Sequence, residues 1–156
     1  MLNLEFLFPG KTREVYLAEG VDDFRKRLAR YAEVEIKTLK DVRPAGKPDG
    51  QIKKEEGEAI LARLNPKALV IALDPGGRTL SSEELAGQIG TWEAGGRHHL
   101  TFLVGGALGL SPEVLARADF RLSLSRLTFT HEMARLILLE QIYRAFNIRA
   151  GTGYHK

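Results

Sequence analysis

Two segments in the second half of the chain have residue types that suit a ligand pocket built from main-chain atoms. In the first, the apolar run 100–104 ends at Gly105-Gly106 and a helix start follows. In the second, the hydroxyl-rich run 122–125 leads to another helix start at Thr130. Glycine allows a ligand to approach the backbone closely, and free N–H and C=O groups can bind the edge of a heterocyclic ring. We therefore expect both segments to line a binding site, with a bare turn as the alternative for the two glycines.

Side chains that could move a proton or stabilise a developing negative charge lie after the second segment and at the end of the chain. They are His131, Arg135, Tyr143, Arg144, Tyr154 and His155. Histidine titrates near neutral pH, so His131 is a candidate base, with a backbone hydrogen bond at the helix start as the alternative. Tyr143 also suits a core position, and Tyr154-His155 also suit a frayed tail. Because the chain has no cysteine and its histidines are scattered, we expect no metal site.

The elements that must hold these residues alternate between strand and helix patterns. Strands are predicted at 2–8, 34–39, 68–73, 100–104 and 120–124, and helices at 12–31, 55–64, 81–92, after 111 and at 131–147. Ser81 and Glu84 have the spacing of a capping box, and Asp74-Pro75-Gly76-Gly77 is expected to form a turn. This alternation predicts a three-layer α/β/α fold with a mostly parallel sheet, and 156 residues suit a single domain, 1–156.

The predicted strand ends that could form a pocket all lie in the second half of the chain. They are at Leu73-Asp74, at Gly105-Gly106 and at 125–128, and ligands bind at the carboxyl ends of strands in parallel sheets. An ordinary dinucleotide-binding fold has its glycines after the first strand, in a GxGxxG spacing that is absent here. The pattern therefore excludes that class of site.

The last predicted helix is apolar over an unusually wide arc. Its apolar residues are Met133, Leu136, Ile137, Leu138, Leu139, Ile142, Tyr143 and Phe146. A helix needs only an apolar stripe to cover a sheet, so the surplus predicts a second buried face. We expect a dimer contact there.

Charge and composition favour a polyanionic partner. The net charge is +3 and the isoelectric point is near 9.3, which is typical of nucleic-acid-binding domains, with a generically basic surface as the alternative. The basic run 25–30 is either a solvated helix face or an RNA-binding stripe. The segment 40–54, which contains Arg43, is rich in lysine, proline and glycine. It is expected to be a mobile loop, either a linker or an RNA-binding arm.

Location follows from what the sequence does not contain. It has no apolar run of about 20 residues that could span a bilayer. Its first residues lack the basic and apolar regions of a signal peptide, and it has no cysteine for disulfides. We expect a cytoplasmic protein without a membrane segment.

The motifs together resemble those of a known family. They are Leu73-Asp74 with Gly77 and Ser81, Val104-Gly105-Gly106 with Gly109-Leu110-Ser111-Pro112, Leu122-Ser123-Leu124-Ser125 with Leu127-Thr128 and His131, Tyr143-Arg144-Ala145, and Tyr154-His155. In this order and spacing, and over essentially the whole chain, the sequence resembles the RlmH (YbeA-type) ribosomal RNA large-subunit methyltransferases of the SPOUT superfamily.

The resemblance implies a C-terminal deep trefoil knot, a homodimer, and S-adenosylmethionine as the cofactor. It also implies methylation of N3 of a pseudouridine in the helix 69 loop of 23S rRNA, on the assembled ribosome. The cofactor-binding positions that it implies are Leu73, Gly105, Gly106, Leu124, Ser125, Arg126, Leu127, Thr128 and Phe129, with Arg126 included for its backbone only. Thr130 and Glu132 flank His131 at positions where other members of the family can have proline.

For catalysis, the resemblance directs attention to His131, Arg135, Arg144, Tyr154 and His155. Pseudouridine N3–H is a weak acid, so its removal needs a base or a donor that stabilises the resulting oxyanion. Our hypothesis is that Tyr154 and His155 gate the pocket and position the base, within their own subunit or across the dimer. The sequence does not identify the base, and it assigns no role to Lys156.

Two other functions remain open on the sequence. One is a non-catalytic, ribosome-associated RNA-binding protein on a SPOUT scaffold, and the other is a nucleotide-binding domain with unrelated chemistry. Binding of S-adenosylmethionine would distinguish both from the methyltransferase.

Overall fold

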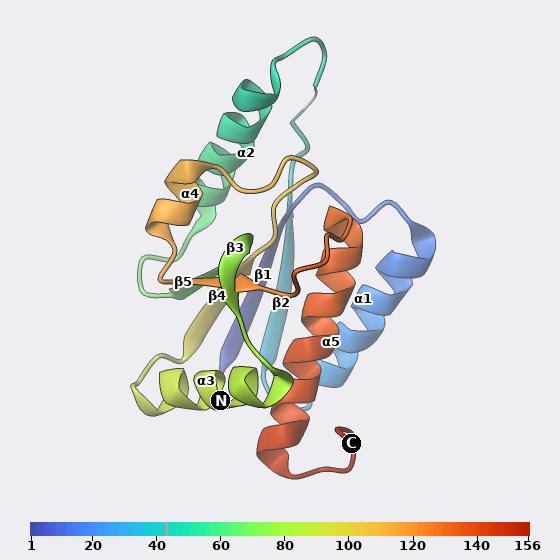
Figure 1. The fold of residues 1–156 in the computed structure, drawn as a ribbon, viewed down its shortest axis with the longest axis vertical. Coiled ribbons are helices and arrows are strands. Elements are labelled where there is room, and N and C mark those ends of the chain that lie inside the picture. Colours follow the sequence, from blue (N-terminus) through green and yellow to red (C-terminus); the bar gives the residue numbers. More distant parts are fainter. Residues whose placement is uncertain (43) are drawn as a thin grey trace.

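The computed structural model describes residues 1–42 and 44–156, in which five strands alternate with five helices (Figure 1). The strands are β1 (Asn3–Pro9), β2 (Glu33–Leu39), β3 (Leu69–Thr79), β4 (His99–Leu103) and β5 (Phe120–Ser123), and the helices are α1 (Val15–Leu28), α2 (Asp49–Arg63), α3 (Ser82–Ala94), α4 (Pro112–Arg117) and α5 (His131–Ala150). Arg43, part of the predicted basic segment, lies outside the described residues. Among those described, no helix is both long and apolar enough to cross a membrane.

The five strands form one sheet in the order β2-β1-β4-β3-β5. Every pairing between neighbouring strands is parallel; for example, Phe102 in β4 lies opposite Phe6 in β1 and Ile71 in β3. The prediction of an α/β fold with a mostly parallel sheet is therefore confirmed. Because the strands run in one direction, their carboxyl ends lie at the same edge of the sheet, which is where the candidate site must be sought.

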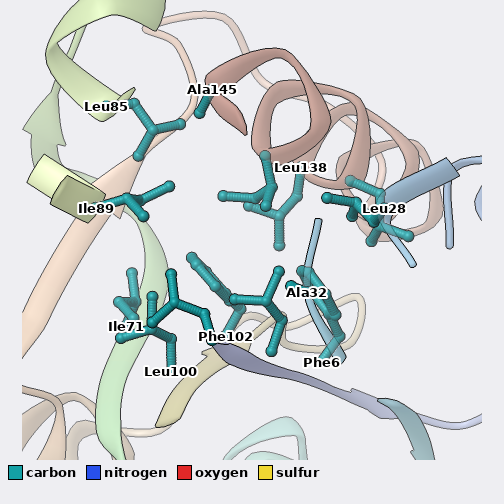
Figure 2. Close-up of a cluster of buried hydrophobic side chains, with 14 of the residues drawn as sticks. Phe6, Leu28, Ala32, Ile71, Leu85, Ile89, Leu100, Phe102, Leu138 and Ala145 are labelled. Carbon is teal, nitrogen blue, oxygen red and sulfur yellow. The ribbon is translucent and has the colours of Figure 1, made fainter. Parts of the chain in front are cut away.

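Helices cover both faces of this sheet. On the face covered by α1, α3 and α5, Phe6, Phe102 and Leu138 belong to the larger core cluster, shown in Figure 2. On the opposite face, Leu7 and Ile60 belong to a second cluster beneath α2 and α4. Successive side chains of a strand point to opposite faces, so adjacent β1 residues serve both cores. Burial on both faces explains why residues 69–73 of β3 form a continuous apolar run.

The wide apolar arc of α5 is explained in part by its neighbours in the same chain. The helix lies between α1 and α3 as well as on the sheet (Figure 1). Gly20 of α1 allows this close packing, because a Cβ atom there would lie 2.8 Å from Leu136 Cδ1. Leu138 is fully buried, whereas Met133 and Ile137 are only half buried. Part of the additional apolar surface of α5, from which a dimer contact was predicted, is therefore buried against other helices of the same chain.

The predicted helix starts agree closely with the structure. Ser81 and Glu84 form a complete capping box at α3, and the hydroxyls of Ser111 and Thr130 cap α4 and α5. Pro112 occupies the first turn of α4, where its missing N–H costs nothing. The predicted capping box and the predicted helix starts after 111 and at Thr130 are therefore confirmed.

Two boundary predictions were wrong. The segment 40–54 is not one loop, because α2 already begins at Asp49, after Pro48 at the N-cap position. An acidic residue in the first turn favours a helix start through the helix dipole. The predicted turn at 74–77 is instead part of β3, which passes a register shift between Leu73 and Arg78 and continues to pair with β5.

Candidate functional site

A cavity lies at the carboxyl ends of β4, β3 and β5, which are neighbours in the sheet. The loops that follow these strands form its walls, mainly at residues 73–75, 104–110 and 122–129. Its volume is about 420 Å³, which is within the range of small-molecule sites, roughly 300–1,000 Å³. This is the sheet edge at which the sequence predicted a ligand pocket.

Most of the predicted cofactor-binding residues lie in the cavity wall. They are Leu73, Gly105, Gly106, Leu124, Ser125, Leu127, Thr128 and Phe129. Arg126 is exposed and does not belong to the wall, which agrees with including it for its backbone alone. The structure therefore brings together the three segments that the sequence placed at one site, and their binding of a cofactor stays a prediction.

Gly105 is required by the packing of its own loop. A Cβ atom at Gly105 would lie 2.6 Å from the carbonyl carbon of Gly109, so the loop could not close on itself. A Cβ atom at Gly106 would lie 2.9 Å from a carboxylate oxygen of Glu56 on α2, a flexible side chain that can move aside. The alternative of a turn residue thus accounts for Gly105, and close approach of a ligand to these glycines stays a prediction.

The loop at residues 124–129 presents main-chain groups to the cavity. Ser125 organises it: its hydroxyl accepts the N–H of Leu127, and its carbonyl accepts the Ser123 hydroxyl at 3.0 Å. The N–H and C=O groups of Thr128 and Phe129 have no hydrogen-bond partner among the described residues. Main-chain groups are usually paired, so these are available to a ligand.

His131 is the candidate base that the structure places in the cavity wall. About a third of its side chain (33%) is exposed. Burial lowers the pKa of His131, and the positive charge of Arg135 lowers it further, against the opposing effect of the Glu132 and Asp41 carboxylates. The ring is therefore neutral at neutral pH, and a neutral imidazole has a lone pair that can accept a proton.

Arg135 lies outside the cavity wall, although it was expected among the catalytic residues. It is fully buried and stacks on Phe8, with its guanidinium carbon 4.7 Å from the ring centroid. It donates to the carbonyls of Pro9 at 2.8 Å and Gly10 at 3.0 Å, and to the Thr12 hydroxyl at 3.0 Å. Its partners are thus all within the protein, and it ties the end of β1 to the start of α5.

The C-terminal tail packs on the far end of α5 from the cavity (Figure 1). The Tyr154 ring meets Tyr143 edge-on, with centroids 4.8 Å apart. His155 lies between Arg144 Nη1, 3.1 Å from its Nδ1, and Glu83 Oε1, 2.6 Å from its Nε2. The tail is therefore not frayed. Tyr154 and His155 contact Tyr143 and Arg144, which lie about 18 Å along α5 from His131. The tail therefore does not touch the cavity of its own subunit in this structure, and gating of a cavity by the tail stays a prediction.

The sequence did not indicate Lys53, which also lies in the cavity wall. It was assigned to a loop, and only the earlier start of α2 brings it to the site. The one local signal for this helix start is Asp49, an acidic residue directly after Pro48, which suits the first turn of a helix. Within the described residues, no group of three or more His, Cys, Asp or Glu side chains could hold a metal ion.

The chain matches a family model described as "Predicted SPOUT methyltransferase" over residues 2–155. It is 50% identical over 153 residues to the ribosomal RNA large subunit methyltransferase H of Desulfotalea psychrophila, covering 97% of this chain and 98% of that protein. It is 46% identical over 159 aligned positions to the protein of the same name from Bifidobacterium animalis subsp. lactis, covering 99% and 100%.

Solved structures share the fold at low sequence identity. A probable methylase family protein from Haemophilus influenzae has a TM-score of 0.57 at 13% identity, over 99% of this chain and 71% of that one. A probable methyltransferase from Bordetella pertussis has a TM-score of 0.57 at 14% identity, over 93% and 96%. With the full-length family match and relatives of about half identical sequence, the chain belongs to the SPOUT methyltransferases and, within them, to the ribosomal RNA large subunit methyltransferase H family.

Proposed function

We propose that this protein, as one domain of residues 1–156, uses S-adenosylmethionine to methylate N3 of a pseudouridine in the helix 69 loop of 23S rRNA on the assembled ribosome. The names of its relatives support methylation of large-subunit ribosomal RNA. The observation that carries the proposal is the cavity at the ends of β3, β4 and β5, with a neutral histidine in its wall. The target nucleotide rests on the sequence motifs shared with the family.

The cavity suits the two halves of S-adenosylmethionine. Leu73, Leu124 and Phe129 supply apolar surface for the adenine ring, and the unpaired main-chain groups of Thr128 and Phe129 can bind its polar edge. Lys53 and Asp74 in the same wall offer one charge of each sign for the zwitterionic methionine end. The residues present therefore fit the cofactor.

When bound, S-adenosylmethionine supplies a methyl group on a positively charged sulfur. In the proposed reaction, His131 takes the proton from N3, and the N3 electron pair forms the new bond to the methyl carbon. The methyl donor would leave as a neutral thioether that keeps the electron pair of the broken carbon–sulfur bond, and His131 would release its proton to solvent. The protein mainly holds the reactants in line, which can supply several kcal/mol of the barrier.

Two structural parts of the proposal follow from the family. The first is that the C-terminal segment is threaded as a deep trefoil knot, consistent with the meeting of loops 104–110 and 122–129 around one cavity. The second is a homodimer, for which the half-buried Met133 and Ile137 on α5 offer apolar surface. The dimer also offers the tail a function, because Tyr154 and His155 pack on Tyr143 and Arg144, away from the cavity of their own subunit, and a partner's cavity is the alternative target.

The basic side chains best placed for RNA are those of α2. Lys53 lies in the cavity wall, and Lys54 is exposed beside it. On α1, by contrast, Arg25 pairs with Asp22 and Arg27 with Asp23, which favours the solvated-face interpretation of that run. RNA contact by segment 40–54 stays part of the proposal.

The KM for ribosomes is expected to rise with salt, because phosphate contacts release condensed counterions. Two or three contacts predict an increase of about 10- to 40-fold between 50 and 200 mM monovalent salt. Steady-state methylation at several salt concentrations measures it, and the Kd of S-adenosylmethionine over the same range is the control. A KM that does not respond to salt would contradict an electrostatic interface.

The proposed function is tested by transfer of labelled methyl groups to ribosomes that lack the modification, followed by mapping of the labelled nucleotide. Label on N3 of the helix 69 pseudouridine supports it, and label elsewhere overturns the target. Calorimetry with S-adenosylmethionine adds a second readout, with a Kd on the order of micromolar expected. Ribosome binding without cofactor binding or label would instead support the non-catalytic alternative.

A further inference from the structure

Glu132, in the first turn of α5, holds a segment that is distant in the sequence. Its Oε1 atom accepts the N–H of Arg13 at 2.8 Å and that of Glu14 at 3.0 Å. Glu14 is the N-cap residue of α1 and forms no capping bond with its own side chain. A carboxylate from α5 therefore binds main-chain donors at the start of α1, where the helix dipole favours negative charge.

The other half of this segment is held from the next turn of the same helix, α5. Arg135, one turn after Glu132, binds the main chain at Pro9 and Gly10 and the side chain of Thr12, as described above. We call residues 9–14 the β1–α1 segment. Glu132 holds one half of it and Arg135 the other, so that the exposed Lys11 side chain projects from a fixed backbone next to the cavity edge of the sheet, whereas Arg13 pairs with Asp41 at 2.8 Å.

The same carboxylate also faces the candidate base. Glu132 Oε2 lies 3.9 Å from His131 Nε2. The other charged groups that act on His131 are Arg135 on α5 and Asp41 after β2, and Lys53 of α2 lines the same cavity. Glu132 thus contacts both the β1–α1 segment and His131.

We propose that Glu132 is a positioning residue for methyl transfer, which joins the β1–α1 segment to His131 so that the base and the Lys11 side chain of the segment meet the RNA as one unit. The inference rests on the proposed function, which does not itself involve Glu132. It assigns two separable roles to one carboxylate: two hydrogen bonds that hold the segment, and a negative charge that acts on the base.

Two substitutions separate these roles. Glu132→Gln keeps a carbonyl oxygen that can accept both N–H groups but removes the charge, and Glu132→Ala removes both. Glu132→Ala is expected to raise the KM for ribosomes about tenfold, as for loss of a hydrogen bond to a charged group, with an unchanged Kd for S-adenosylmethionine. Glu132→Gln is expected to keep KM within about threefold of the wild type, because the acceptor remains.

The charge has its own readout in the pH profile of kcat/KM. The Glu132 carboxylate raises the pKa of His131, so its neutralisation lowers that pKa. The reaction needs the neutral ring, so activity is lost as pH falls through the pKa of His131. The acid limb of the profile should therefore move to lower pH in both variants, which a purely structural residue would not cause.

Glu19→Gln is the matched control, because it removes an exposed carboxylate from α1 outside the segment. It should leave both KM and the acid limb in place. If the wild type is active and Glu132→Ala leaves the KM for ribosomes unchanged, the proposed role of Glu132 is wrong, although the proposed function stands. The same holds if the acid limb of the pH profile moves in neither variant. A wild type that does not methylate ribosomes overturns the proposed function and this inference with it.

Discussion

Replacement of His131 by asparagine is expected to lower kcat for ribosome methylation by about 10²- to 10⁴-fold, the usual contribution of a general base. Asparagine is polar and of similar size but cannot take up a proton at neutral pH. The position is partly exposed at the first turn of α5, and Thr130 rather than His131 caps the helix. The fold should therefore be retained, and the loss should appear in kcat with little change in the Kd of S-adenosylmethionine.

The pH profile and chemical rescue identify the role of His131 more directly. Since burial and Arg135 lower the pKa of His131 below its ordinary value, the wild-type enzyme should keep its activity at neutral pH and lose it only in acid. That limb should vanish in His131→Asn. In His131→Ala, added imidazole should restore part of the rate. Full activity of His131→Asn would exclude this residue as the base and transfer the search to the partner subunit's tail.

The elements that the sequence predicted well are those with local causes. Ser81 and Glu84 form a capping box within four residues, and the apolar run at 69–73 needs nothing but burial on two faces to become a strand. The position of the cavity follows by the same logic, because parallel strands end at one edge whatever their order.

The two wrong boundaries have different causes. Residues 74–79 contain proline and glycine and look like a turn, yet pairing of Thr79 with the distant Ser123 in β5 extends the strand. The start of α2 was missed because Pro48 and Gly50 are typical of a loop, although Pro48 is the N-cap residue and Asp49 begins the helix.

At the candidate site, too, features with local causes were predicted and those that depend on long-range contacts were not. The strand ends at Leu73-Asp74 and 125–128 were predicted from local strand patterns, and the resemblance to the family extended the second to the run 124–129. Arg135 was expected to be catalytic because its type and position suit an anion, but its acceptor in β1 is 126 residues away in the sequence. The partner of Glu132 is likewise 119 residues away. Long-range hydrogen bonds decide such roles, and only the folded structure reveals them.

Deletion of residues 152–156 is expected to leave the fold intact and to lower methylation by about 100-fold or more, the cost of losing correct placement of reacting groups. The tail contributes surface contacts, such as Tyr154 on Tyr143 and His155 with Glu83. It contributes nothing to the core beneath α5. Thermal unfolding should therefore shift by only a few degrees. Undiminished activity on ribosomes would show that the tail has no part in the reaction.

Mixed dimers decide whether the tail acts on the cavity of its own subunit or on that of the partner. A truncated chain has an intact cavity but no tail, and a His131→Asn chain has an intact tail but no base. If the tail acts across the dimer, a heterodimer has one complete site, and an equal mixture should regain about a quarter of wild-type activity after subunit exchange, since half of its dimers are mixed and each has one working site of two. If each tail served its own subunit, no combination would be complete and the mixture would stay inactive. Recovery of activity from two inactive chains would thus establish both the dimer and the direction in which Tyr154 and His155 act.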